Sequence, residues 1–335
     1  MRIKIGIIFI FFFTLLYASD LQAQEKAFPK QGEGITLFLK RHNRSGAEYQ
    51  KQFIQLNKTR LGKGNTLQMG VKYTLPPLKG KETVTPKQNN YEPLFGKQLA
   101  QYKVESNELK GTCFYLVSGH GGPDPGAIGR IGNVELHEDE YAYDIILRLA
   151  RNLLTKGAKV HIIIQDAKDG IRNDRYLSNS KRETCMGSPI PFNQVRRLQQ
   201  RCDKINSLFT KDRELYKRAI FVHVDSRSKS HQTDVFFYHS EKSSESKHLA
   251  KTMKSTFTHK YKKHQPGRGF SGTVDGRDLY VLRNTTPPSV FVELGNIQNT
   301  FDQQRIILSD NRQALANWLC EGFITDYNRY KKKIK

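Results

Sequence analysis

The sequence predicts an α/β protein with a mostly parallel, twisted sheet flanked by helices, preceded by a small α+β unit. From residue 111 to residue 330, short apolar runs alternate with amphipathic segments of helical spacing, which is the pattern of parallel strands joined by helices. Residues 31–77 have a different, mixed pattern, and the stretch 78–110 begins with a polar, proline-containing linker and ends as lead-in structure. A chain of 335 residues is long enough for about one to three domains.

The N-terminus has the pattern of a secretory signal. MRIK is basic, Ile5–Ala18 is an almost unbroken apolar run, and Leu21-Gln22-Ala23 ends on a small residue. The run is shorter than the roughly 20 apolar residues of a membrane span. We therefore expect residues 1–23 to be cleaved, so that only the signal meets the membrane and the mature protein is periplasmic or secreted. An uncleaved anchor is the alternative.

The charge of the chain is strongly basic. Lysine and arginine number 55, against 32 aspartate and glutamate residues, and the surplus is spread along the chain. In an exported protein this surplus favours an anionic envelope polymer as partner and argues against nucleic acid. Simple solubility is the alternative explanation of the charge.

Four cysteines lie beyond the signal. Export permits a disulfide, and Cys185 and Cys202, in polar, loop-rich sequence, are the expected pair. Cys113 and Cys320 lie in apolar stretches typical of core thiols. Because the chain has no Cys-x-x-Cys pair, its spacing gives little support for a thiolate zinc site.

The unit at residues 31–77 combines two spacings. Ile35, Leu37 and Leu39 alternate, as in a strand, whereas Tyr49, Phe53, Ile54 and Leu56 recur at helical spacing, and residues 71–76 form a short strand. The opening Gly-Glu-Gly-Ile at 32–35, Leu56-Asn57, and Leu67 to Gly70 leading into Tyr73 resemble a LysM module, a small carbohydrate-binding fold. The resemblance implies two helices on a two-stranded sheet and binding to peptidoglycan. An unrelated helical spacer is the alternative.

The larger domain, 111–330, is expected to contain four buried strands and four helices. The strands are predicted at 113–117, 160–164, 219–224 and 290–294, and the helices at 141–154, 192–209, 247–257 and 312–327. The segment 168–190 interrupts this alternation. We expect it to be an inserted loop, and its position and length make it a candidate lid.

Polar side chains occur where the apolar strands end. In an open α/β sheet, sites form beyond the carboxyl ends of the strands. His120 follows the first strand, and His223 and Glu293 lie near the ends of two later strands. Two histidines and a carboxylate suit a catalytic zinc, which takes three protein ligands and leaves one position for water. Four residues just ahead of the 141–154 helix are candidates for the third ligand, and their position alone does not decide among them: Glu135, His137, Glu138 and Glu140.

Four blocks of the larger domain resemble the zinc-dependent N-acetylmuramoyl-L-alanine amidases. They are His120-Gly121-Gly122-Pro123-Asp124-Pro125-Gly126-Ala127-Ile128-Gly129, Glu138 ahead of Ile146-Leu147-Arg148-Leu149, Val222-His223-Val224-Asp225, and residues 288–299 with Glu293-Leu294-Gly295-Asn296. Two weaker signatures are Leu198, Arg201 and Asn206, and Arg268-Gly269 with Val281-Leu282-Arg283. The blocks occur in the family's order over more than 200 residues.

The resemblance implies a function and a role for each residue. His120, Glu138 and His223 would bind Zn²⁺, and Glu293 would be the general base of a hydrolase that cleaves the amide between the muramic acid lactyl group and L-alanine of the peptidoglycan stem. Val222, Asp225 and Asn296 depart from the family's usual residues, and we expect them to alter only the substrate rim.

Three other interpretations compete with this one. A zinc peptidase acting on the stem peptide is one, although His-Glu-x-x-His is absent. A non-catalytic wall-binding protein with a degenerate amidase domain is the second. The third is a phosphate-binding loop at the glycines of 121–129. The chain lacks the Gly-Lys-Ser/Thr and Gly-x-Gly-x-x-Gly patterns of such loops, which argues against this interpretation.

Overall fold

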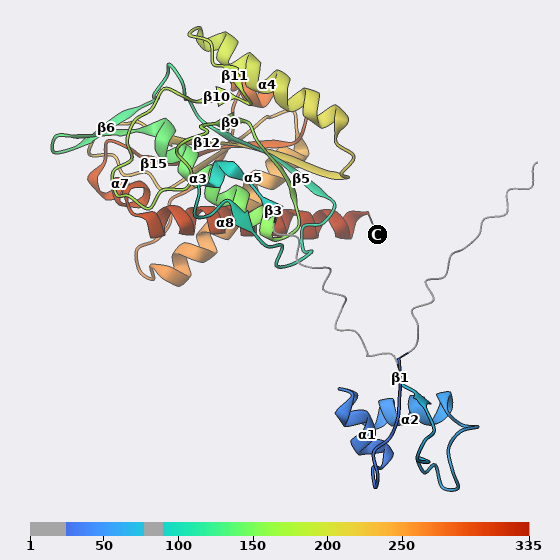
Figure 1. Ribbon diagram of the computed structural model, residues 1–335. Coiled ribbons are helices and arrows are strands. Elements are labelled where there is room, and N and C mark those ends of the chain that lie inside the picture. The colour runs from blue at the N-terminus through green and yellow to red at the C-terminus, as the bar shows by residue number, and fades with distance from the viewer. Residues whose placement is uncertain (1–24, 77–89, 335) are drawn as a thin grey trace, which may run out of the picture. The chain divides into compact units, whose positions relative to one another are not determined.

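The computed structural model describes residues 25–76 and 90–334 (Figure 1). The chain divides into two compact units between residues 86 and 87, and each is described here by itself. The predicted signal, 1–23, and most of the predicted linker lie outside the described residues. Within 25–76 and 90–334, no helix has the length and apolar character needed to cross a membrane.

The N-terminal unit has two helices and a two-stranded antiparallel sheet. Its elements are β1 (Lys26–Ala27), α1 (Ile35–Arg41), α2 (Ala47–Leu56) and β2 (Tyr73–Thr74), with β1 paired to β2. The strand-like spacing at 35–39 was misleading, because this segment is α1. Phe38 and Leu39 point into the core and Leu37 is 60% exposed, so the buried positions follow the helical i, i+3, i+4 pattern from Ile35.

One buried asparagine joins the two parts of this unit. The Asn57 side chain donates to the carbonyl oxygens of Phe53 and Thr74, and its Oδ1 accepts from the Thr74 amide at 2.8 Å. The end of α2 is thereby fixed against β2, and a core of Phe38, Phe53 and Tyr73 packs beneath.

The larger unit is built on a six-stranded sheet in the order β14-β13-β15-β12-β5-β8. The predicted strands are β5 (Thr112–Ser118), β8 (Lys159–Ile162), β12 (Tyr216–Asp225) and β15 (Ser289–Asn296), and these four are mutually parallel. Two strands had not been predicted. β13 (Phe236–His239) pairs antiparallel with β15, and β14 (Thr273–Gly276) pairs parallel with β13. The prediction of a mostly parallel α/β sheet is confirmed.

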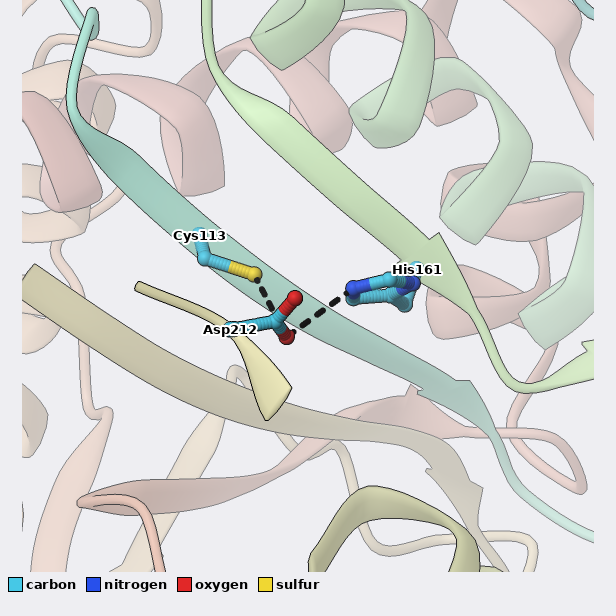
Figure 2. Close-up of side chains that lie close together, drawn as sticks. All are labelled: Cys113, His161 and Asp212. Carbon is cyan, nitrogen blue, oxygen red and sulfur yellow. Dashed lines mark hydrogen bonds and ion pairs between the residues drawn. The ribbon is translucent and has the colours of Figure 1, made fainter. Parts of the chain in front are cut away.

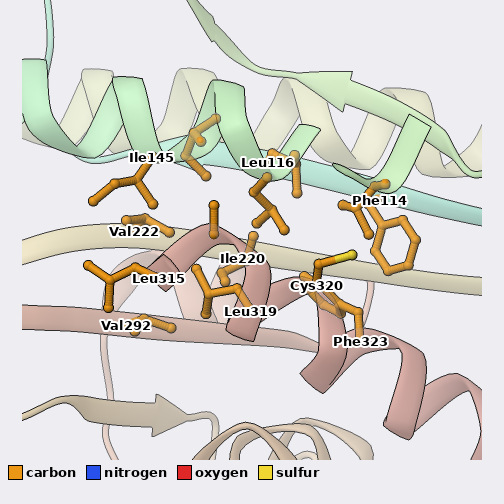
Figure 3. Packing of buried hydrophobic residues seen from close by; sticks show 14 of the residues in the cluster. Phe114, Leu116, Ile145, Ile220, Val222, Val292, Leu315, Leu319, Cys320 and Phe323 are labelled. Atoms are coloured by element: carbon orange, nitrogen blue, oxygen red, sulfur yellow. The ribbon is translucent and has the colours of Figure 1, made fainter. Parts of the chain in front are cut away.

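Helices cover both faces of this sheet (Figure 1). On one face α3 (Glu138–Thr155), α5 (Ser244–His264) and α8 (Ser309–Lys333) enclose the main core with residues such as Phe114 and Leu116 of β5. Figure 3 shows this packing against α8. On the other face α4 (Gln194–Lys211) and α6 (Tyr280–Asn284) pack on Cys113, Tyr115 and Val117 of the same strand. The alternation of side chains along β5 thus divides the core into two layers.

Shorter elements complete the unit. They are β3 (Asn90–Tyr91), η1 (Pro93–Phe95), β4 (Gln101–Tyr102), the hairpin of β6 (Ile128–Ile131) and β7 (Val134–His137), the small sheet of β9 (Ile164–Gln165), β10 (Thr184–Cys185) and β11 (Ser188–Pro189), and α7 (Thr300–Ile307).

The segment 168–190 is more ordered than the inserted loop that had been predicted. Its later part forms β10 and β11. Its earlier part is tied to α3, because the Arg172 guanidinium pairs with Glu140 at 2.9 Å and the Arg172 amide donates to Asp144 at 2.8 Å. These buried contacts hold the segment against α3, so they give no support to the expectation that it is a lid.

The expected Cys185–Cys202 disulfide is wrong, since all four cysteines are unpaired and buried. Cys185 and Cys202 both belong to the apolar layer beneath α4, and the Cys202 sulfur accepts a hydrogen bond from Thr285 Oγ1 at 3.6 Å. The polar sequence around the two cysteines did not mark an exposed position, because the thiols point inward and the nearby Arg201 and Glu183 are buried as well.

Candidate metal centre

The carboxyl ends of β5 and β12 and the start of α3 bring His120, Glu138 and His223 together. One ligand atom from each lies within 4.8 Å of the other two. His223 Nδ1 is 2.8 Å from Glu138 Oε1, and His120 Nε2 is 3.2 Å from Glu138 Oε2. The two imidazole rings meet edge to face with centroids 4.9 Å apart. The structure therefore assembles the three residues that the sequence placed near one sheet edge.

Among the four candidates for the third position, only Glu138 turns toward the histidines. Glu135 faces Arg130 on the β6–β7 hairpin, and His137 hydrogen-bonds Glu135 at 3.1 Å. Glu140 is turned to Arg172. Glu138, the first residue of α3, accepts hydrogen bonds from the backbone amides of Ala127 at 2.8 Å and Val224 at 3.0 Å, which fix the direction of its carboxylate.

The imidazole of His120 is oriented by a second carboxylate. His120 Nδ1 lies 2.9 Å from Asp124 Oδ2, and Asp124 is itself paired with Arg197 of α4 at 2.6 Å. Arg201, also on α4, donates to the His120 carbonyl oxygen at 2.8 Å. A histidine that ligates a metal usually has such a partner on its other ring nitrogen, which leaves Nε2 free to face the ion.

Two glycines, one just ahead of the first block and one within it, are required by the space around these ligands. A Cβ at Gly119 would lie 2.3 Å from Cε1 of His223. A Cβ at Gly126 would lie 2.6 Å from Glu138 Oε2 and 2.6 Å from Cδ2 of His120, and Gly126 has φ +69°. His120 itself has φ +57°, so the turn after β5 is sharply bent to present its ring. The glycines here serve close packing on the ligands, not the cradling of a phosphate.

The electrostatics of the cluster favour positive charge between the histidines. Burial opposes a charged His120, but Glu138 and Asp124 outweigh it and raise the pKa of His120 to about 10. Burial likewise opposes ionisation of Glu138, yet His120 and His223 lower its pKa far below the usual range. Burial lowers the pKa of His223. The Glu138 carboxylate is thus held ionised between a protonated His120 and a neutral His223, and metal ligation would require His120 to release its proton.

Glu293 lies on β15 at the position paired with His223 of β12. Within the described part of the chain its Oε2 is buried and has no hydrogen-bond partner. Burial, followed by the charges of Glu138 and Asp225, raises the pKa of Glu293 well above its usual value. A buried carboxyl without a partner is costly to a folded protein, and such groups gather at functional sites.

A cavity of about 110 Å³ adjoins the cluster. Its wall includes His120 and His223, and Arg201 and Leu198 reach it from α4. Phe291 of β15 lies in the same wall and stacks on the His223 ring at 4.3 Å between centroids. The two histidines therefore border a small, partly open cavity with an apolar side.

The donor set fits zinc. Two imidazoles and one carboxylate are among the ligand sets of catalytic zinc sites, which leave a further position open. Here the three donors converge and the carboxylate is held by two backbone amides.

Sequence reasoning assigned no role to the residues that hold the ligands in place. Asp124 had been quoted only as part of the first block, and Arg197 had not been noticed. The spacing of four residues between His120 and Asp124 in a glycine-rich turn is the signal that could have found Asp124. Of the weaker signatures, Arg201 contacts the His120 carbonyl, and Asn206 fixes the loop after α6 through Asn284 and Thr286.

Comparison with known proteins agrees with the resemblance. The sequence model of the family described as N-acetylmuramoyl-L-alanine amidase matches residues 115–325. A curated relative from Bacillus anthracis, an uncharacterized cell wall amidase, is 25% identical over 244 residues, which are 70% of this chain and 39% of that protein. This chain thus spans well under half of that relative's length.

Solved structures of similar proteins include an N-acetylmuramoyl-L-alanine amidase from Clostridium difficile 630, 22% identical, covering 67% of this chain and 98% of that one with a TM-score of 0.48. The catalytic domain of the amidase CwlV from Bacillus (Paenibacillus) polymyxa var. colistinus is 21% identical, covering 65% of this chain and 98% of that one with a TM-score of 0.46. Since the family model matches more than half of the residues, the chain belongs to the N-acetylmuramoyl-L-alanine amidase family.

Proposed function

We propose that this protein is a zinc-dependent N-acetylmuramoyl-L-alanine amidase that hydrolyses the amide between the muramic acid lactyl group and L-alanine of peptidoglycan. The observation that carries the proposal is the convergence of His120, Glu138 and His223 at one sheet edge, with Glu293 opposite His223, in a chain of this family. Peptidoglycan, both glycan and stem peptide, is the substrate and partner.

His120, Glu138 and His223 would hold the ion. Zinc supplies, when bound, a Lewis acid for a carbonyl oxygen and lowers the pKa of water. Asp124 and Arg197 keep the His120 ring in place, and the amides of Ala127 and Val224 keep Glu138 in place. The ligands are therefore rigid before substrate arrives.

Glu293 is the proposed general base and then general acid. Its carboxylate accepts a proton from the attacking water and donates it to the departing nitrogen of L-alanine. The raised pKa of Glu293 makes its carboxylate a stronger base than an ordinary glutamate, and a cation held by the neighbouring ligands opposes that rise. The Glu293 carboxyl group alone can therefore accept the proton from water and donate it to the leaving nitrogen.

We propose further that residues 31–77 are a LysM-like module that binds peptidoglycan, and that the chain is exported by residues 1–23. The two helices and paired strands of the N-terminal unit support the first part, and the basic-apolar-small pattern of the signal supports the second. Deleting residues 24–76 should weaken pull-down by insoluble cell wall while leaving turnover of soluble fragments near wild type. Undiminished pull-down would reject the module.

A zymogram on cell-wall material tests the catalytic proposal, with wild type, Glu293→Ala and Glu135→Ala compared. Glu135 is a matched control, because this carboxylate lies near the start of α3 but faces Arg130. We expect clearing by wild type and Glu135→Ala, none by Glu293→Ala, and loss of wild-type clearing with a chelator that added zinc restores. Equal clearing by all three proteins, or by metal-free protein, would reject the mechanism.

A further inference from the structure

A second cluster of metal-ligating side chains lies at the opposite end of the sheet from the candidate metal centre. Cys113 is near the start of β5, His161 lies on the neighbouring β8, and Asp212 ends α4 ahead of β12. Figure 2 shows the three side chains directed toward one another from these separate elements. One ligand atom of each lies within 4.8 Å of the other two.

The carboxylate of Asp212 is the centre of this cluster. Its Oδ2 is 3.4 Å from Cys113 Sγ and 3.0 Å from His161 Nε2. Tyr115 OH donates to the same oxygen at 2.7 Å, and Lys159 Nζ lies 2.6 Å from Oδ1. Since the His161 ring stacks on Tyr115 with centroids 5.5 Å apart, the donor atoms are held by packing as well as by hydrogen bonds.

The order of the groups excludes a cysteine nucleophile. In a Cys-His-Asp triad the histidine lies between thiol and carboxylate, so that it can take the thiol proton. Here the carboxylate lies between thiol and imidazole (Figure 2). Burial and then the charge of Asp212 raise the pKa of Cys113 to about 12, which keeps the thiol protonated in the absence of a cation.

The same arrangement is suited to a borderline divalent cation. Thiolate, imidazole and carboxylate are the ligands that Zn²⁺ prefers, and its tetrahedral site places sulfur and nitrogen ligands roughly 3.5 Å apart. When the ion binds, the Cys113 thiol loses its proton to solvent, and a thiolate, a carboxylate and a divalent ion sum to zero charge.

Lys159 would have to leave the carboxylate, and a second acidic partner is at hand. Its ammonium already lies 3.5 Å from Glu214, and its side chain is 43% exposed. Cys113 and Asp212 are buried, whereas His161 and Lys159 reach solvent, so an ion would enter from their side. Tyr115 would remain as the hydrogen-bond partner of the ligating carboxylate.

We propose that Cys113, His161 and Asp212 form a second, structural site for a divalent ion of the zinc class, separate from the catalytic site. The ion would tie the end of α4 to β5 and β8. Because α4 also carries Arg197 and Arg201, it would brace the helix that holds the His120 loop.

Cobalt titration distinguishes the two sites, since a thiolate bound to Co²⁺ gives a near-ultraviolet charge-transfer absorption and the catalytic cluster has no sulfur. The protein would be the chain without residues 1–23, freed of metal and kept reduced by a non-thiol reductant. We expect wild type to bind two equivalents of Co²⁺, of which one gives the absorption. The absorption should vanish in Cys113→Ser and persist in Cys320→Ser and His120→Ala. Cys320 is the matched control, being a buried thiol of the other core layer.

His161→Gln retains the thiol and provides a test independent of Cys113. It should weaken the cobalt site by more than the roughly 10- to 100-fold that loss of a ligand's hydrogen-bond partner costs. No charge-transfer absorption in folded wild type, its survival in Cys113→Ser, or unchanged affinity in His161→Gln would overturn the proposal. Loss of the band in His120→Ala alone would assign it to the catalytic site and overturn it equally.

Discussion

His223 and Glu293 occupy paired positions on neighbouring parallel strands, β12 and β15. The pairing shifts directly afterwards, so that Asp225 pairs with Asn296 and an extra residue is accommodated near Gly295, which has φ +107°. The Val224 amide donates to Glu138 instead of to the sheet. Val224 faces the β5 side of β12, where the pairing ends with Val222 opposite Ser118, so its amide is available to the third proposed ligand. The bulge itself lies on the β15 side, next to the proposed metal ligands, where bulges are common.

Asp124→Asn tests the orientation of His120. The change keeps the side chain's size but removes the charge that faces Nδ1, so we expect zinc affinity to fall about 10- to 100-fold, as is usual for the partner of a ligating histidine. Competition with a chromophoric chelator measures it. An affinity equal to that of wild type would show that Asp124 does not position the ligand.

Gly126→Ala should displace the metal ligands, and Gly132→Ala is its matched control. Both glycines have positive φ, so both substitutions carry similar backbone strain, but a Cβ at Gly132 meets nothing within 4 Å. A Cβ at Gly126 would overlap Glu138 and His120. We expect zinc affinity to fall at least about tenfold only for Gly126→Ala. Equal losses in the two variants would mean that strain, not crowding, is responsible.

The stability of the metal-free protein should depend on pH through Glu293. Its pKa is raised in the folded state, so the folded chain keeps a proton that the unfolded chain releases above about pH 4.3. The folded state then binds more protons, and its stability falls as pH rises through that value. Glu293→Gln should therefore match wild type near pH 4 and exceed it in denaturation midpoint near pH 8. A difference independent of pH would contradict this.

Asp144→Ala should destabilise the larger unit by about 3–5 kcal/mol, because it leaves buried arginines without their partner. Asp144 is fully buried and pairs with Arg148 and Arg312, and it also accepts from the Arg172 amide. Urea unfolding measures the loss. Asp278→Ala, which removes the exposed partner of Arg283, is the control and should change nothing measurable. Similar midpoints for both variants would refute the importance of the buried network.

The strands that carry the site could be predicted because their apolar runs are short and end in polar residues or glycine. β13 was missed because Phe236–His239 is brief and follows a polar stretch, and its antiparallel pairing with β15 depends on contacts distant in sequence. The spacing at α1 resembled that of a strand because Ile35, Leu37 and Leu39 alternate. Phe38, which completes the helical pattern, had not been taken into account.

The third proposed ligand could be placed only by resemblance. Each residue of a helix is rotated by about 100° from the last, so Glu138 and Glu140 face different neighbours. The contact of Glu140 with Arg172 joins residues distant in sequence, so no local sequence pattern could have predicted it. The Cys113 cluster has no sequence signature, because the strand order alone brings β5 beside β8. The disulfide prediction failed for a related reason, since pairing depends on side-chain direction.

The products released from purified peptidoglycan test the central proposal most directly. Mass spectrometry of a wild-type digest should show intact stem peptides with a free N-terminal L-alanine, and glycan whose muramic acid carries a free lactyl carboxylate. Shortened stems with the muramoyl–alanine bond intact would instead identify a peptidase and contradict the proposed amidase.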